Sequence, residues 1–157
     1  MSETTIFTSA IILGIACSLL FIPSIADKYS RKKVFCFSLV VSGVTQICIL
    51  ISNSYILTLV LLFLFGASWP GVFIVGLVYS LELFPKQAQK LYIFQFLLLN
   101  ALSLLAISYY YGRISQDWYF IHIIAIVLQF VGLLFCILFV PESLWTYYND
   151  NKFQKVR

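Results

Sequence analysis

The sequence predicts an all-α polytopic membrane protein with five transmembrane helices, and three observations lead to this fold class. Of the 157 residues, 62% are hydrophobic and only 10% are charged, against roughly 25% charged residues in a soluble domain. Five apolar runs are each about as long as the roughly 20 residues that a helix needs to cross a bilayer. None of the runs alternates with a period of two as a membrane β-strand does. Because the backbone in lipid must satisfy its own hydrogen bonds, the runs are expected to form helices.

The predicted spans follow one another through short polar turns, so consecutive helices are expected to pack antiparallel. The first run has no basic residue before it and ends near Pro23 and Asp27, which is typical of a retained span rather than a signal peptide. Together the spans form a single transmembrane domain. In chain order they cover about residues 6–25, 34–51, 55–81, 91–111 and 119–140, and a tail follows at 141–157.

Small residues distinguish the third span. Ala67 and Gly71 stand four residues apart, as in helices that approach each other closely, and Pro70 can kink a helix. Close packing explains these residues most simply, and a hinge within the span is the alternative.

Polar side chains interrupt the fourth span on one face. At about 100° per residue they fall within an arc of roughly 160°, so they could face one cavity or make hydrogen bonds between helices. Gln46 and Gln129, on the second and fifth spans, are expected to serve packing. The polar residues of the fourth span are Gln95, Asn100, Ser103 and Tyr110.

The basic residues indicate an orientation. If all five helices cross, nine of the ten lie on one side and only Arg113 lies opposite. The positive-inside rule then predicts an outside N-terminus and a cytoplasmic C-terminus, in the plasma membrane or an internal membrane. The nine are Lys28, Arg31, Lys32, Lys33, Lys86, Lys90, Lys152, Lys155 and Arg157.

Chemistry-bearing groups are few, and an enzyme is not expected. The bases sit beside apolar runs rather than on a face interleaved with stacking aromatics, so nucleic acid is not expected as a partner. The cysteines Cys17, Cys36, Cys48 and Cys136 lie inside apolar runs without metal-ligand spacing, and His122 stands alone beside Trp118. No catalytic residue, metal or cofactor is therefore predicted.

Three stretches resemble motifs of the major facilitator superfamily. "PSIADKYSRKK" resembles the family's G-x-x-x-D-(R/K)-x-G-R-(R/K) turn, with Pro23 and Ser30 where glycines are usual. "ELFPKQAQK" resembles the E-x-x-P-x-x-x-R turn of sugar-porter and organic-ion-transporter members, with Gln89 at the basic position. "VPESLWTYY" resembles the P-E-S stretch that follows the family's sixth helix. The matching residues are Asp27, Lys28, Arg31 and Lys32, then Glu82 and Pro85, then Pro141, Glu142 and Ser143.

The resemblance implies that the five spans correspond to family helices two to six, a partial N-terminal bundle. It implies transport of a small organic solute, a sugar or an organic ion, by alternating access, with the chain as a fragment of or derivative from a secondary transporter. It also implies a need for the lipid bilayer and for the missing first helix and second six-helix half, or a partner chain. The alternative is a non-transporting membrane subunit that binds a partner through its helix faces.

The resemblance further implies site residues. In the family, the charges at this membrane face form a salt-bridge network that holds the outward-open state. Asp27 also contacts the second half in the family, so here it is expected to be exposed or neutralised by Lys28 or Arg31. The fifth family helix lines the solute pathway, which assigns Gln95, Asn100, Ser103 and Tyr110 to that pathway. The implied network comprises Asp27, Lys28, Arg31, Lys32, Glu82 and Glu142.

Overall fold

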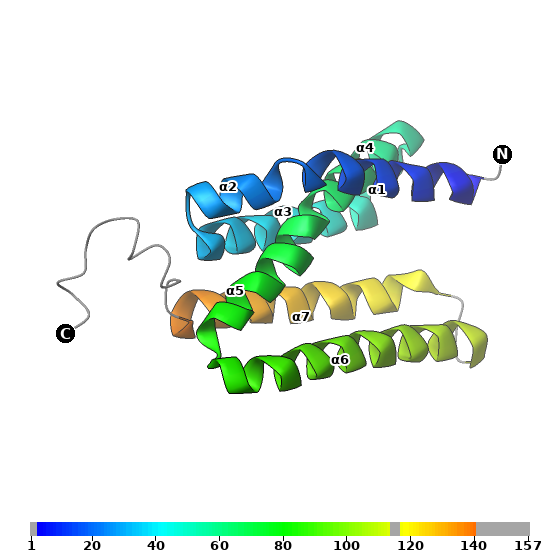
Figure 1. The fold of residues 1–157 in the computed structure, drawn as a ribbon. Coiled ribbons are helices and arrows are strands. Elements are labelled where there is room, and N and C mark those ends of the chain that lie inside the picture. The colour runs from blue at the N-terminus through cyan, green and yellow to red at the C-terminus, as the bar shows by residue number, and fades with distance from the viewer. Residues whose placement is uncertain (1–2, 114–116, 141–157) are drawn as a thin grey trace.

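The computed structural model describes residues 3–113 and 117–140, and within them five helical spans are long and apolar enough to cross a membrane. This confirms the predicted fold class. The predicted tail at 141–157, including Glu142, lies outside the described residues. The first span consists of α1 (Glu3–Leu19) and α2 (Ile22–Lys28), and the second is α3 (Arg31–Ile51) (Figure 1). The third span consists of α4 (Tyr55–Pro70), the π-helix η1 (Gly71–Val75) and α5 (Gly76–Leu83). The fourth and fifth spans are α6 (Lys86–Arg113) and α7 (Trp118–Phe139).

Two helices begin a few residues before the apolar runs from which they were predicted. Helix α3 starts at Arg31 and α6 at Lys86, whereas the runs begin at Val34 and Leu91. A hydropathy pattern counts Lys and Arg as turn residues, but their long side chains reach toward water while the backbone is already helical. The turns that join the spans are correspondingly short, for example the two residues between Lys28 and Arg31.

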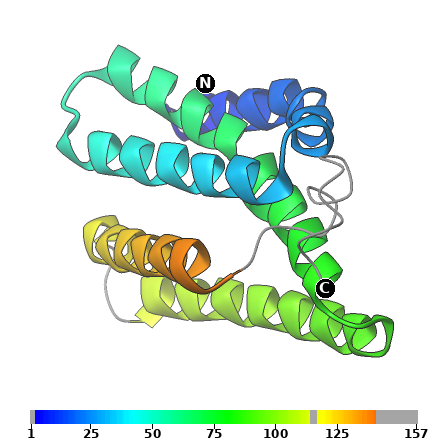
Figure 2. The ribbon, with the colours of Figure 1, turned by 90° about the vertical axis from the view of Figure 1, so that its left-hand side faces the viewer.

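The helices form two groups joined by the third span. Helices α1, α2, α3 and α4 lie together, α6 and α7 run antiparallel to each other, and α5 runs from the first group toward α6 and α7 (Figure 1). The view turned by 90° shows α3 on the side that faces α7 (Figure 2). The first group and α7 are therefore packed through α3.

The closest helix contact lies between α1 and α4. A Cβ atom added to Gly14 would collide with the carbonyl oxygen of Phe63, and one added to Gly66 would collide with that of Ile11. Each backbone thus presses against a glycine of the other helix, which is how helices associate in lipid. The contact depends on Gly14, which the sequence pattern did not single out, and Gly71 lies instead against Ser38 of α3.

Glutamines join α3 to α7. The Gln46 side-chain nitrogen donates to Gln129 Oε1 over 3.1 Å, and Gln129 Nε2 donates to the Leu39 carbonyl over 2.8 Å and to the Ser42 hydroxyl. These hydrogen bonds connect side chains far apart in sequence within the apolar span. Packing is therefore the structural role of both glutamines, as expected.

Helix α6 is attached differently. None of its residues is buried. It contacts the third span and the turn after it through hydrogen bonds from Gln89 and through aromatic rings, with centroid distances of 5.1 Å for Phe73 and Phe96 and 4.9 Å for Phe84 and Tyr92. The rest of this helix presents its side chains outward.

Candidate functional site

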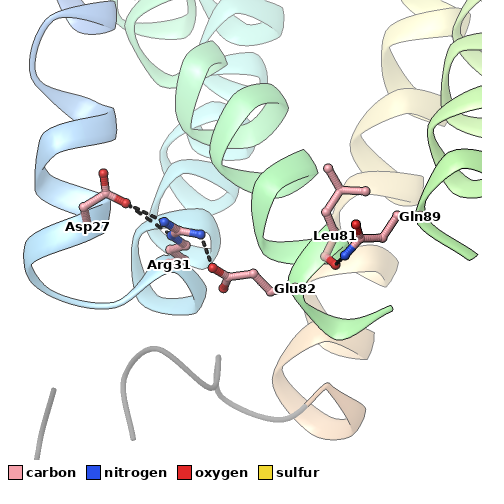
Figure 3. A network of polar contacts seen from close by, with 5 residues as sticks. All are labelled: Asp27, Arg31, Leu81, Glu82 and Gln89. Atoms are coloured by element: carbon pink, nitrogen blue, oxygen red, sulfur yellow. Dashed lines mark hydrogen bonds and ion pairs between the residues drawn. The ribbon is translucent and has the colours of Figure 1, made fainter. Parts of the chain in front are cut away.

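The candidate site is the charge cluster centred on Arg31, the first residue of α3. Its Nη2 and Nε atoms lie 2.8 and 3.3 Å from Asp27 Oδ1, one helical turn earlier at the end of α2. Its Nη1 atom donates to Glu82 Oε1 at the end of α5 (Figure 3). One guanidinium thus joins two carboxylates that are 55 residues apart in sequence, from Asp27 to Glu82, because the fork of donors on Arg can serve both.

The two carboxylates differ in exposure. The side chains of Arg31 and Glu82 are 19% and 26% exposed, whereas Asp27 is 62% exposed. Water therefore screens the Asp27 pair, which is worth about 0 to 1 kcal/mol. Removing one partner of a sheltered pair leaves the other charge uncompensated, so the Arg31–Glu82 pair is the more sensitive of the two. The second oxygen of Glu82 is buried and has no hydrogen-bond partner within the described ranges.

Lysine side chains flank this cluster. Lys32 donates to the backbone oxygen of Val140 over 2.6 Å, which links the first turn of α3 to the residue that follows α7. Lys28 is exposed at the end of α2. Val140 directly precedes the stretch that carries Glu142, the one predicted network residue that lies outside the described residues.

Gln89 supports the turn that carries Glu82. Its side-chain nitrogen donates to the carbonyl oxygens of Leu81 and Phe84, over 2.9 and 3.2 Å, and Figure 3 draws the bond to Leu81. The last carbonyls of a helix lack partners within the helix. The residue at the motif's basic position thus caps α5, a role that a charge-based comparison of motifs does not reveal.

The predicted pathway residues lie along α6. Gln95, Asn100 and Ser103 are exposed, and the Ser103 hydroxyl donates to the Asn100 carbonyl of its own helix over 2.7 Å. The ring of Tyr110 lies edge-on to that of Tyr111 at 5.7 Å. All four side chains therefore lie on α6, and the contacts described for Ser103 and Tyr110 are with residues of the same helix.

Other reactive side chains do not form a recognisable site. His122 lies edge-on to Trp118, with ring centroids 5.4 Å apart. Sequence reasoning missed the proximity of Cys36 and Cys136, whose sulfurs are 3.7 Å apart across α3 and α7, because 100 residues separate them. Over residues 3–113 and 117–140, no group of three or more His, Cys, Asp or Glu side chains is arranged to hold a metal ion.

The chain was also compared with known proteins. A search of curated proteins found none that matches. A family model described as Major Facilitator Superfamily matches residues 1–149. That match covers every described helix and the stretches around Asp27, Glu82 and Glu142. With nearly the whole sequence matched, the chain belongs to the Major Facilitator Superfamily.

Proposed function

We propose that the chain takes part in transport of a small organic solute, such as a sugar or an organic ion, by alternating access. The family consists of secondary transporters of small solutes. Such transporters hold the solute near the bilayer midplane between helix bundles that rock against each other. The observation that carries the proposal is Arg31 between Asp27 and Glu82, because this cluster joins the ends of three different spans.

In this proposal the cluster acts as a gate. The pair between Arg31 and Glu82 favours the conformation in which the ends of α2, α3 and α5 are close. Motion that separates these ends breaks the pair, so a few linked pairs can bias an equilibrium whose free-energy gap is a few kcal/mol. We place Lys28, Lys32 and Glu142 in the same network, supported for Lys32 by its bond at the end of α7.

The solute pathway in this proposal runs along α6. Gln95, Asn100, Ser103 and Tyr110 supply hydrogen-bonding groups on a helix that has no buried residue. Further helices, from the same chain or a partner chain, are proposed to cover this surface and complete the transport unit. The bilayer is the environment that the exposed apolar side chains of the spans require.

A solute-uptake screen tests the proposal. The chain is expressed in its native genetic context, and cells are supplied with labelled sugars, organic cations and organic anions. Arg31→Ala and Glu82→Ala are each expected to lower saturable uptake, and the reversed pair Arg31→Glu with Glu82→Arg to restore part of it. Lys90→Ala, at an exposed basic residue outside the cluster, is the matched control.

Two outcomes contradict the proposal. If Arg31→Ala and Lys90→Ala change uptake equally, the charge cluster does not act as a gate. Absence of uptake for every solute, together with a partner protein cross-linked along α6, favours the non-transporting subunit instead. The 157-residue chain alone in liposomes is expected to give no saturable uptake, because alternating access requires two moving bundles.

Orientation is part of the proposal. The excess of basic residues on one side favours a cytoplasmic location for the α2–α3 and α5–α6 turns, an outside N-terminus and a cytoplasmic C-terminus. Single cysteines at the exposed residues Tyr29 and Asn53, introduced after the four native cysteines are replaced, should react with a membrane-impermeant reagent from opposite sides. Reaction of both from the same side would rule out the proposed topology.

A further inference from the structure

An apolar groove of about 490 Å³ opens on the outer surface of α2, α3 and α4. Its volume lies within the roughly 300 to 1,000 Å³ of sites that hold small molecules. Each helix contributes residues three or four apart, which share one helix face. Examples are Ile22 and Ile25 on α2, Val34 and Phe37 on α3, and Leu64 and Ala67 on α4.

Side-chain size explains the hollow. Tyr29 and Phe37 stand at its rim, each 70% exposed. The floor contains small residues, among them Ser38 and Ser68, which are buried. The Ser68 hydroxyl donates to the Phe65 carbonyl of its own helix over 2.7 Å, so it offers little polarity to the groove. The lining is almost entirely apolar and accessible from the surrounding lipid.

One end of the groove carries a positive charge. Lys33 lines it beside Tyr29, at the turn where α2 gives way to α3. Neighbouring bases are already engaged, Arg31 by two carboxylates and Lys32 by a backbone carbonyl. Neither of the two ion pairs within residues 3–113 and 117–140 involves Lys33. Its ammonium group is therefore placed to meet an anion at the mouth of an apolar channel.

We propose that this groove binds one acyl chain of an anionic phospholipid, with the lipid phosphate on Lys33 and the Tyr29 hydroxyl. A phospholipid combines an apolar chain with a negative group at the membrane surface, which matches the groove from its floor to its charged mouth. The four bases within residues 28–33 add attraction, since clusters of about four to eight Lys or Arg beside a span recruit anionic lipids. The inference is independent of the proposed transport activity.

Lipid retention measures the proposed site directly. The purified chain is mixed in detergent with phosphatidylglycerol or with phosphatidylcholine of the same acyl chains, and bound lipid is counted by native mass spectrometry. Phosphatidylglycerol is expected to bind more tightly. Lys33→Gln is expected to weaken its binding about fivefold, from about 1 kcal/mol for a basic residue near the lipid surface. Lys90→Gln, an exposed lysine outside the groove, is the matched control and should change binding less than about twofold.

The acyl chain is located with a photoactivatable phosphatidylglycerol. Cross-links are expected on Phe37 and Leu64, which line the groove. Because Lys33 is exposed, its replacement should leave the circular dichroism spectrum and elution volume unchanged, so a loss of lipid reports binding rather than unfolding.

Three results would overturn the site. Equal weakening by Lys33→Gln and Lys90→Gln would indicate attraction to net charge alone. Equal retention of the two lipids would leave no role for the anionic group. Cross-links confined to α6, or to a second copy of the chain seated in the groove, would assign the groove a different occupant.

Discussion

The α1–α4 pair and helix α6 are both built from apolar sequence, yet they differ in how closely they contact the rest of the molecule. In the α1–α4 pair, Gly14 of α1 lies against the Phe63 carbonyl of α4, and Gly66 of α4 lies against the Ile11 carbonyl of α1. Along the 28 residues of α6 no side chain is buried, and its first half contacts the end of the third span through aromatic rings and the Gln89 side chain. In lipid, apolar content does not drive helices together, because acyl chains are as apolar as leucine. Small residues that permit close approach therefore determine where this chain packs tightly.

The largest expected effect comes from enlarging a glycine at the close contact. Gly66→Leu places a side chain against the Ile11 backbone, which cannot move as a side-chain end can. We expect the free energy of unfolding to fall by about 3 kcal/mol or more, measured by titration with sodium dodecyl sulfate and followed by circular dichroism.

Gly112→Leu on α6 is the control, since a Cβ there meets nothing within 4 Å, and stability should be unchanged. Gly66→Ala gives an intermediate loss and remains measurable if the leucine variant does not fold. Equal stability of the Gly66 and Gly112 variants would show that the two regions pack alike.

The second effect concerns polar contacts between helices. Gln129→Leu removes the bonds from α7 to Gln46, Leu39 and Ser42. The expected loss is about 1 kcal/mol, within the range measured for hydrogen bonds between membrane helices. Gln95→Leu changes the same residue type on exposed α6 and should cause no loss. A larger loss for Gln95 than for Gln129 would contradict the described packing.

The third effect tests the ring contacts that attach α6. Phe96→Ala removes the contact with Phe73, and the weaker one with Tyr92 at 6.4 Å. We expect a loss of about 1 kcal/mol, together with faster hydrogen exchange in α6 than in α3. Leu104→Ala, at an exposed residue farther along α6, should leave exchange unchanged. If both variants exchange alike, the rings do not anchor this helix.

The smallest effect is expected from the charge cluster. Because Asp27 is exposed and water screens its pair with Arg31, Asp27→Ala should cost about 1 kcal/mol or less of stability. A double-mutant cycle of Arg31→Ala with Glu82→Ala isolates the coupling between these two side chains. Additive effects would leave no coupling. Lys90→Ala should couple to neither residue.

The sequence predicts the number of spans because bilayer thickness fixes the length of an apolar run. It does not identify which helix faces pack, since a lipid-facing side and a helix-facing side are both apolar. Gly14 shows this limit, because a glycine in a uniformly apolar run carries no sign of the partner that approaches it.

For the charge cluster, the motif comparison singled out Arg31 and Glu82, and the structure brings their side chains together. Residue spacing alone could not do so, because the two lie on different spans. The capping bonds of Gln89 likewise depend on the exact direction in which α5 ends, which no spacing rule provides.

The π-helical turn at Gly71–Val75 has a consequence for the register of the third span. A π turn bonds residue i to i+5 and so holds one residue more than an α turn, which places every later side chain about 100° from where an uninterrupted α-helix would put it. Straightening this turn to α geometry with all of its residues retained would rotate Glu82 away from Arg31, whereas deleting one residue from the turn would leave Glu82 facing Arg31. The extra residue within the third span thus sets the direction of a carboxylate about two helical turns further along the chain.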